Sequence, residues 1–142
     1  MYHIHIEREV HFPMDKVWTV LSDIHSYSQH MAFVKKVFAP PVIQPGVSWY
    51  DVTTVLFFPL IIEHKVEKMD DYHIFFTLHG FGIQHEEEHI RIKKVSDHAT
   101  LVIIDLMFTL IPVIHQLLGA FVQRRLRIMC VKSITTLEEK YS

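Results

Sequence analysis

Two histidines flank three glutamates at a spacing that can bind zinc. Residues 85–89 match the H-E-x-x-H pattern, in which a helix brings both imidazoles to one metal ion. The flanking residues alternate between polar and apolar, which predicts a strand instead. On a strand, His85 and His89 lie about 13 Å apart at roughly 3.3 Å per residue. One ion cannot join them, so we expect no metal site and no cofactor.

One histidine falls on an apolar strand face, where it could act as a general base. His64 is in phase with Ile62 and Val66 in a run that alternates with period two, so its imidazole points the same way as their side chains. A buried histidine is satisfied by a backbone carbonyl or contacts a ligand. His64 is therefore a candidate catalytic residue and a candidate ligand contact.

Two carboxylates and an arginine form a second candidate group. Glu86 and Glu88 are in phase with Ile90 and Ile92, so they reach the mouth of any cavity that these isoleucines face. Arg125 falls within the apolar half of the C-terminal helix. Its guanidinium either extends to water or pairs with Glu86, with Glu88 or with an acidic ligand. Glu88 is the second catalytic candidate.

The other acidic and histidine side chains are expected at the surface. His3 and His5 share one face of the first strand, which indicates solvent exposure at a sheet edge. Asp105 is in phase with Ile103 and Met107. The opposite, wholly apolar face of that run consists of Val102, Ile104, Leu106 and Phe108. This apolar face should meet the helix, which places Asp105 on the outer face at a dimer or loop contact, with a cavity acid as the alternative.

Composition excludes several classes of protein. A length of 142 residues fits one domain, 1–142. Hydrophobic residues at 49% and charged residues at 21% are typical of a globular chain and exclude disorder. A net charge of −2 offers no basic face for nucleic acid. With only 4 glycines, the chain carries no glycine-rich phosphate loop.

The sequence also indicates a compartment. Its single cysteine, Cys130, cannot form an internal disulfide, which fits a reducing compartment. The N-terminus lacks the continuous apolar stretch of an export signal. The long apolar segment Leu101–Val122 is interrupted by Asp105 and Pro112, so we expect a strand followed by a helix and no transmembrane span. A cytoplasmic location follows.

Hydrophobic periodicity predicts an α+β domain. Period-two runs predict strands, and a change to a period near 3.6 after Pro112 predicts one long helix up to Tyr141. A short helix opens at Asp15 and a second short turn covers His25 to His30. The predicted strands are His3–Phe12, Phe33–Phe38, Val47–Phe57, Leu60–Lys68, His73–Leu78, Glu86–Val95 and Ala99–Leu110.

A pattern in the N-terminal segment resembles that of a known superfamily. Residues 6–27 are similar to the opening of the START/Bet v 1-like (SRPBCC) superfamily, in its polyketide cyclase/dehydrase and lipid-transport group. The positions that match its V-W-x-x-[LI]-[ST]-D-x-x-x-Y pattern are Val17, Trp18, Leu21, Ser22, Asp23 and Tyr27. Gly46 and Trp49 resemble the entry to the family's next long strand, and the C-terminal helix resembles its last helix.

The resemblance implies a helix-grip fold. In this fold a curved antiparallel sheet of about six or seven strands wraps around a long C-terminal helix, two short helices follow the first strand, and a cavity lies between. It implies binding or transport of a hydrophobic small molecule (lipid, polyketide, sterol-like or quinone-like). The alternatives are a cyclase or dehydratase acting in the same cavity, using His64 or a carboxylate as general base, and a co-chaperone-like interaction module. The family has no universal catalytic residue, so no site is carried over from it. Apolar faces in both the sheet and the long helix favour binding without catalysis.

Helix and strand phases predict which side chains contact the ligand. Apolar faces of the sheet and the long helix should line the cavity. The predicted ligand-binding residues are Leu117, Phe121, Arg125, Ile128, Ile104, Phe108, Ile62 and His64. The apolar run 55–62 is expected to be core, a homodimer contact or a membrane-touching tip.

Overall fold

The computed structural model describes residues 1–54 and 58–141. Its elements follow the predicted order. The strands are β1 (Tyr2–Val10), β2 (Val34–Phe38), β3 (Ser48–Thr53), β4 (Leu60–Asp70), β5 (His73–His79), β6 (Ile83–Ser96) and β7 (Ala99–Leu110). The helices are α1 (Met14–Leu21), the 3-10 turn η1 (Ile24–Ser26), α2 (Tyr27–His30) and α3 (Pro112–Tyr141).

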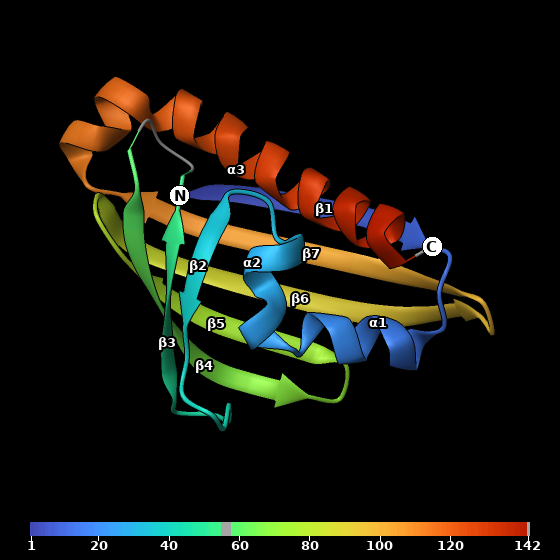
Figure 1. The fold of residues 1–142 in the computed structure, drawn as a ribbon. Helices are drawn as coiled ribbons and strands as arrows, with labels where there is room; N and C mark the ends of the chain where they lie inside the picture. Colours follow the sequence, from blue (N-terminus) through green and yellow to red (C-terminus); the bar gives the residue numbers. More distant parts are fainter. Residues whose placement is uncertain (55–57, 142) are drawn as a thin grey trace.

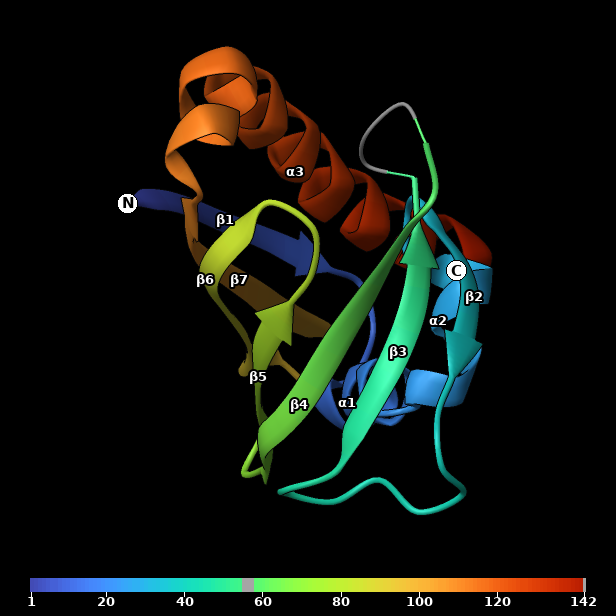
Figure 2. The same cartoon turned by 90° about the vertical axis from the view of Figure 1, so that its left-hand side faces the viewer.

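In the described part of the chain, the strands form one seven-stranded antiparallel sheet in the order β1-β7-β6-β5-β4-β3-β2. The first strand pairs with the last, so β1 and β2 occupy the two edges. Figures 1 and 2 show that the sheet is curved and that α3 runs along its concave side. The predicted helix-grip arrangement and its strand number are confirmed.

Alternation along the strands decides which residues the sheet buries. In β7, Val102, Ile104, Leu106 and Phe108 are all buried, and α3 packs along β1 and β7. The predicted apolar face of this strand therefore does meet the helix. On β6 the same alternation turns Glu86 inward, as the strand interpretation of residues 85–89 requires.

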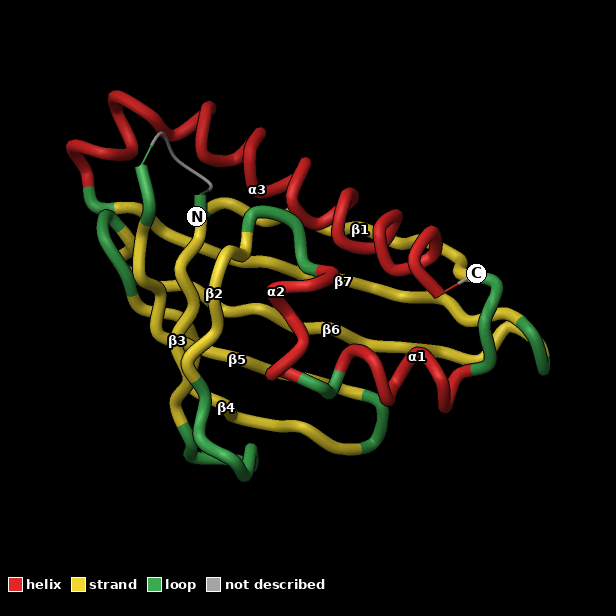
Figure 3. The backbone as a smooth tube through the Cα atoms, in the orientation of Figure 1, coloured by secondary structure: helices red, strands yellow, loops and turns green. Residues whose placement is uncertain are grey.

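The short helices cover some of the concave side that α3 leaves open (Figure 3). Tyr27 at the start of α2 is buried, and its hydroxyl donates a hydrogen bond to the carbonyl of Leu21. Its ring packs edge-to-face on Trp49, with centroids 5.5 Å apart. Tyr27 of the N-terminal pattern thus connects α2 to β3 through Trp49 and to the end of α1 through Leu21.

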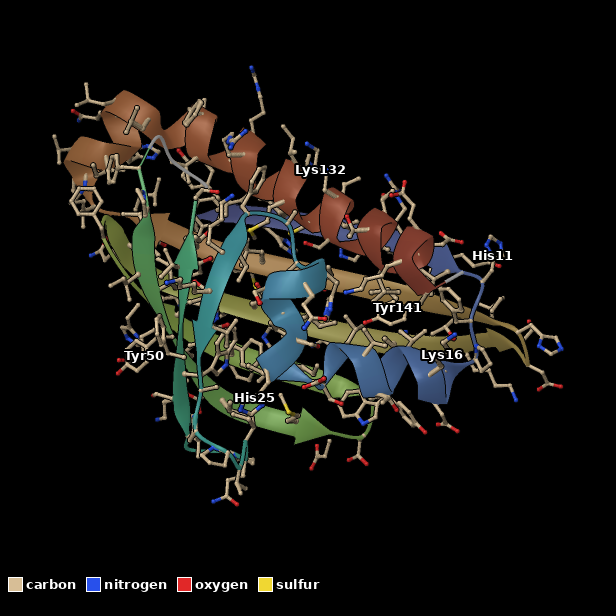
Figure 4. The ribbon with its side chains drawn as sticks, in the orientation of Figure 1. His11, Lys16, His25, Tyr50, Lys132 and Tyr141 are labelled. Carbon is tan, nitrogen blue, oxygen red and sulfur yellow. The ribbon has the colours of Figure 1, made fainter. Side chains whose placement is uncertain are left out.

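The C-terminal end of α3 is fastened to β1 and α1 by polar contacts. Lys16 Nζ donates to the carbonyl of Tyr141 at 3.2 Å, and His11 Nδ1 lies 2.5 Å from Glu138 Oε1. Figure 4 shows His11, Lys16 and Tyr141 gathered at this end. The opposite, N-terminal end of α3 begins directly after β7. These contacts hold the last turns of α3 close to α1 and to the residue that follows β1.

The packed face of α3 differs from the one expected from the helical wheel. Its buried residues are Gly119, Val122, Leu126, Cys130, Ser133, Ile134 and Leu137. Leu117, expected to face the sheet, is 74% exposed. Large apolar side chains occur on nearly every side of α3, so apolarity alone does not define which side faces the sheet; the packing of the buried residues on β1 and β7 shows it.

The end of β3 and the character of the helices can also be compared with the predictions. Strand β3 ends at Thr53, and residues 55–57, which the predicted strand and part of the apolar run include, lie outside the described residues. Among the helices that the structure describes, none combines the length and apolar character needed to cross a membrane.

Replacing two leucines of α3 tests the observed packed face. Leu137 is 3% exposed and Leu117 is 74% exposed. We expect Leu137→Ala to lower the free energy of unfolding by about 2–5 kcal/mol through lost burial and a new void. Leu117→Ala, the matched control with the same change in helix propensity, should stay within about 0.5 kcal/mol of the parent. Urea unfolding measures both, and equal losses would contradict this orientation of α3.

Candidate functional site

A cavity of about 110 Å³ lies between the concave face of the sheet and α3. Because α3 packs along β1 and β7, the surface formed by β3 to β6 is less closely covered, and the cavity forms over it. Most of its lining is apolar. Representative lining residues are Leu60 and Ile62 of β4, Leu78 of β5, and Val122, Leu126 and Met129 of α3.

Four ionisable residues interrupt this apolar lining. They are Asp51 of β3, His64 of β4, and Glu86 and Glu88 of β6, and we call them the polar cluster. Asp51 and Glu86 are 4% and 5% exposed. A charge in such surroundings is costly unless it is paired or neutralised, so these groups need a specific electrostatic arrangement.

Strand pairing brings Asp51 and His64 together. Trp49 pairs with His64, and Asp51 pairs with Ile62, two residues earlier in β4. Asp51 and His64 are therefore diagonal neighbours on one face. Tyr50, between the two inward residues of β3, turns to the outer side, where its hydroxyl donates to Glu63 Oε2 at 3.1 Å (Figure 4).

Asp51 and His64 form a buried hydrogen-bonded pair. His64 Nε2 lies 2.8 Å from Asp51 Oδ2. The indole of Trp49 stacks on the imidazole, with centroids 3.9 Å apart and planes inclined by 10°. When Nε2 donates to Asp51, Nδ1 carries the lone pair and can accept a proton. This is the relation between histidine and aspartate in a catalytic triad, here without an adjacent nucleophile among the described contacts.

Several polar atoms around this pair have no partner. Asp51 Oδ1, His64 Nδ1, Trp49 Nε1 and Thr53 Oγ1 are buried without a hydrogen-bond partner in the part of the chain that the structure describes. Leaving such an atom unpaired costs about 1–3 kcal/mol, and more when the group is charged. Because these residues line the cavity, a bound molecule could supply the missing hydrogen bonds.

The two inward glutamates of β6 hold protons unusually tightly. Burial, reinforced by the charges of Glu88 and Asp51, raises the pKa of Glu86 to about 8. Burial also raises the pKa of Glu88; His64 opposes this rise and Asp51 adds to it. Glu86 is therefore largely a neutral acid at pH 7, able to donate a hydrogen bond or a proton. The cavity thus combines a potential proton acceptor with a potential proton donor.

Some of the predicted site residues line the cavity. Ile62, His64 and Phe108, together with the second catalytic candidate Glu88, all lie on its wall. These four come from strands, where the period of two fixes the direction of each side chain. The role of each in binding or catalysis stays a prediction.

The predictions on α3 are less accurate. Leu117 is exposed, so its placement in the cavity is wrong. Phe121, Arg125 and Ile128 are half-buried on α3 and are not among the described residues that line the cavity. The guanidinium of Arg125 lies over the ring of Phe33, 4.4 Å from its centroid. The rotation of α3 described above accounts for these differences.

Ile104 and Asp51 illustrate errors of a different kind. Ile104 is buried, but it lines a small separate hollow with Leu137 and Ile134. Asp51 was missed, although it is in phase with Trp49 along β3. An acidic residue on the face of a strand that also carries a tryptophan is the signal that could have identified it.

The sequence matches no protein-family model and no curated protein. Solved structures are nevertheless similar over almost the whole chain. A START superfamily protein from Mycobacterium smegmatis superposes with a TM-score of 0.84 at 16% identity, covering 100% of both chains. Norcoclaurine synthase from Thalictrum flavum has a TM-score of 0.74 at 14% identity, covering 99% of this chain and 88% of the synthase. The chain has the START/Bet v 1-like fold.

An aromatase/cyclase is also similar. Zhui aromatase/cyclase from Streptomyces sp. R1128 has a TM-score of 0.72 at 14% identity, covering 97% of this chain and 89% of the cyclase. At these identities the likeness establishes the START/Bet v 1-like fold and transfers no residue's role. The roles of the polar cluster therefore depend on its own geometry.

The raised pKa of Glu86 predicts that the free energy of unfolding changes with pH. In the unfolded chain the carboxyl titrates near 4.5, but in the folded protein near 8. Between these values the folded state holds the extra proton, so stability falls as pH rises and the loss is complete above pH 8. Glu86→Gln removes this loss. We expect it to be more stable than the parent at pH 8.5 by roughly 2–4 kcal/mol, and similar at pH 4.5.

Urea unfolding over this pH range measures the difference between the two proteins. Asp51, His64, Glu88 and Cys130 face or surround Glu86 and are present in both proteins. Their own contributions to the pH dependence of the free energy of unfolding therefore cancel in the comparison. Glu9→Gln, at an exposed position of β1, is the control and should show little pH-dependent difference. A difference between Glu86→Gln and the parent that does not change with pH would contradict the protonated state of Glu86.

Proposed function

We propose that this protein binds or transports a hydrophobic small molecule that carries a hydrogen-bonding group. Its apolar body would occupy the cavity, and its polar group would contact the polar cluster. The observation that carries the proposal is that Asp51 Oδ1 and His64 Nδ1 are buried without a hydrogen-bond partner among the described residues, while both residues belong to the lining of a mostly apolar cavity. A ligand hydroxyl would satisfy one of them and remove its desolvation cost.

The size of the cavity limits the part of the ligand that it can enclose. Its volume of about 110 Å³ is somewhat smaller than an engineered apolar cavity of about 150 Å³ that binds benzene. The cavity therefore accommodates roughly one small ring or a short chain. A larger lipid or polyketide would need α3 to move outward.

The exposed apolar residues near one end of the cavity suit the uptake of such a molecule. Phe58 and Phe81 are 49% and 58% exposed and pack edge-to-face with centroids 6.1 Å apart. The turn at Gly82 is held to the start of α3, because Ile111 N donates to its carbonyl at 3.0 Å. Phe81 also lines the cavity. An apolar ligand could pass along these side chains. In a homodimer, the same side chains would form the contact between copies.

The similar structures support small-molecule binding in this fold. The norcoclaurine synthase structure is a complex with dopamine and hydroxybenzaldehyde, which are small aromatic molecules with hydroxyl groups. The Zhui protein is an aromatase/cyclase. We extend only the ligand class to this chain: a molecule with an apolar body and a polar group. The single, buried Cys130 supports the proposed cytoplasmic location.

The Asp51–His64 pair favours a second candidate function, an enzyme of cyclase or dehydratase type. His64 Nδ1 would remove a proton from a carbon next to a carbonyl. Glu86, protonated at pH 7, would donate its proton to the carbonyl oxygen, so that a neutral enol forms. A positioned acid or base contributes about 10²–10⁴-fold to the rate.

Phenol and toluene form a matched pair that tests the proposed binding. They have nearly the same shape, but only phenol can donate a hydrogen bond to the polar cluster. A hydrogen bond to a charged group contributes about 1.5–3 kcal/mol, so phenol should bind roughly 10–100-fold more tightly than toluene. Asp51→Asn should reduce this preference to a few-fold, as measured by isothermal titration calorimetry.

Glu63→Gln is the matched control. Glu63 precedes His64 in β4 but contacts Tyr50 on the outer side, so both affinities should stay unchanged. Toluene binding as tightly as phenol would contradict the role of the polar cluster, and absence of binding by both would contradict the cavity as a ligand site.

Deuterium uptake tests the second candidate function. Phenylacetone in D₂O should exchange its protons next to the carbonyl faster with the protein than with buffer, as followed by NMR. His64→Gln should slow the catalysed exchange about 10²–10⁴-fold, while phenol affinity changes by no more than roughly tenfold. Exchange at the buffer rate would exclude this proton transfer and leave binding as the function.

A further inference from the structure

A second group of ligating side chains lies on the outer face of the sheet, away from the cavity. His3 and His5 of β1 and Asp105 of β7 place their side-chain ligand atoms within 4.8 Å of one another. His5 Nδ1 lies 2.6 Å from Asp105 Oδ1, and His3 Nε2 lies 2.8 Å from the same oxygen. Both imidazoles therefore converge on one carboxylate oxygen.

The strand register fixes this arrangement. His5 is paired directly with Asp105 across the β1–β7 ladder. His3 lies two residues earlier in β1, on the same face. The backbones of two adjacent antiparallel strands thus hold all three residues, so the cluster does not depend on a flexible loop. Sites built on strands keep their geometry better than sites built on loops.

The surroundings of the cluster resemble those that orient metal ligands. The second ring nitrogen of His5, Nε2, lies 3.1 Å from Glu7 Oε1. A histidine that ligates a metal usually donates its other N–H to such a carboxylate, which fixes the tautomer. On the other side, Arg91 Nη1 lies 3.4 Å from Asp105 Oδ2 and leaves Oδ1 directed at the histidines.

We propose that His3, His5 and Asp105 form a binding site for a divalent transition-metal ion of the zinc class. Two imidazoles and one carboxylate are suited to zinc and its neighbours, whereas Mg²⁺ and Ca²⁺ prefer oxygen ligands alone. Of the H-E-x-x-H segment, His89 pairs with Asp105 in the β6–β7 ladder, but its Nδ1 lies 2.9 Å from His73 Nε2, and the three ligand atoms that lie together belong to His3, His5 and Asp105. The ion would join the edge strand β1 to β7.

The present distances require only a small adjustment. Ligand atoms in a tetrahedral zinc site with bonds of 2.0–2.1 Å are about 3.3 Å apart. The two histidine nitrogens must therefore withdraw from Asp105 Oδ1 by roughly 0.5–0.7 Å and, from within 4.8 Å of each other, come to the same separation, replacing their hydrogen bonds with metal bonds. The side chains of His3 and His5 are 55% and 48% exposed, so they are free to make this movement and an ion can reach them. A fourth position remains open to water.

Zinc titration of the untagged full chain at pH 7.5 tests the site. We expect isothermal titration calorimetry to show one Zn²⁺ per chain, and Zn²⁺ to raise the thermal unfolding midpoint. His3→Ala and Asp105→Asn should each lower the affinity at least tenfold. His98→Ala, in the exposed turn between β6 and β7, is the control and should bind as the parent does.

Cobalt absorption provides a second readout, because the visible bands of Co²⁺ report nitrogen and oxygen ligands directly. His3 is an exposed residue of an edge strand, so His3→Ala keeps the fold even if Asp105→Asn does not. Circular dichroism verifies this. The absence of saturable binding by the parent would overturn the proposal. Parent-like affinity in His3→Ala, or loss of binding only on replacing His73 and His89, would also overturn it.

Discussion

Four ionisable side chains on the concave face of the sheet must be accommodated among the apolar residues that form the core. Asp51 and His64 do so by pairing at 2.8 Å beneath the indole of Trp49. Glu86 has no such partner among the described residues and instead keeps its proton, with a pKa of about 8. If α3 packed closely over these groups, they would be fully desolvated and would lack hydrogen-bond partners. The sheet and α3 therefore stay apart over them, and the cavity lies there.

The position of the cavity follows from how α3 is attached. The helix packs along β1 and β7, and contacts from Lys16 and His11 hold its C-terminal end. The sheet continues beyond the helix through β6 to β3, and α1 and α2 cover only part of that surface (Figure 1). Alternation along β1 and β7 places His3, His5 and Asp105 on the opposite, outer face, away from the polar cluster of β3, β4 and β6.

Much of the fold could be predicted from the sequence, because strand alternation and the change of period at Pro112 are local signals. His64, Glu88, Ile62 and Phe108 were assigned to the cavity because a period of two leaves little freedom of direction. The orientation of α3 could not be predicted, since apolar residues occur on most sides of this helix and the surface on which it packs comes from other segments of the chain; hence Leu117 was misplaced. The Asp51–His64 pair depends on the register of two strands, which no single segment encodes.

The most direct test of the cavity as a ligand site is native mass spectrometry of the protein purified from the cells that naturally produce it. We expect a non-covalent adduct that, once released, has the mass of an apolar molecule with a hydroxyl or carbonyl group. Met129→Trp, which fills the cavity from α3, should lack this adduct. The mass of the chain alone in the parent, or an adduct of unchanged occupancy in Met129→Trp, would contradict the binding of a hydrophobic ligand in this cavity.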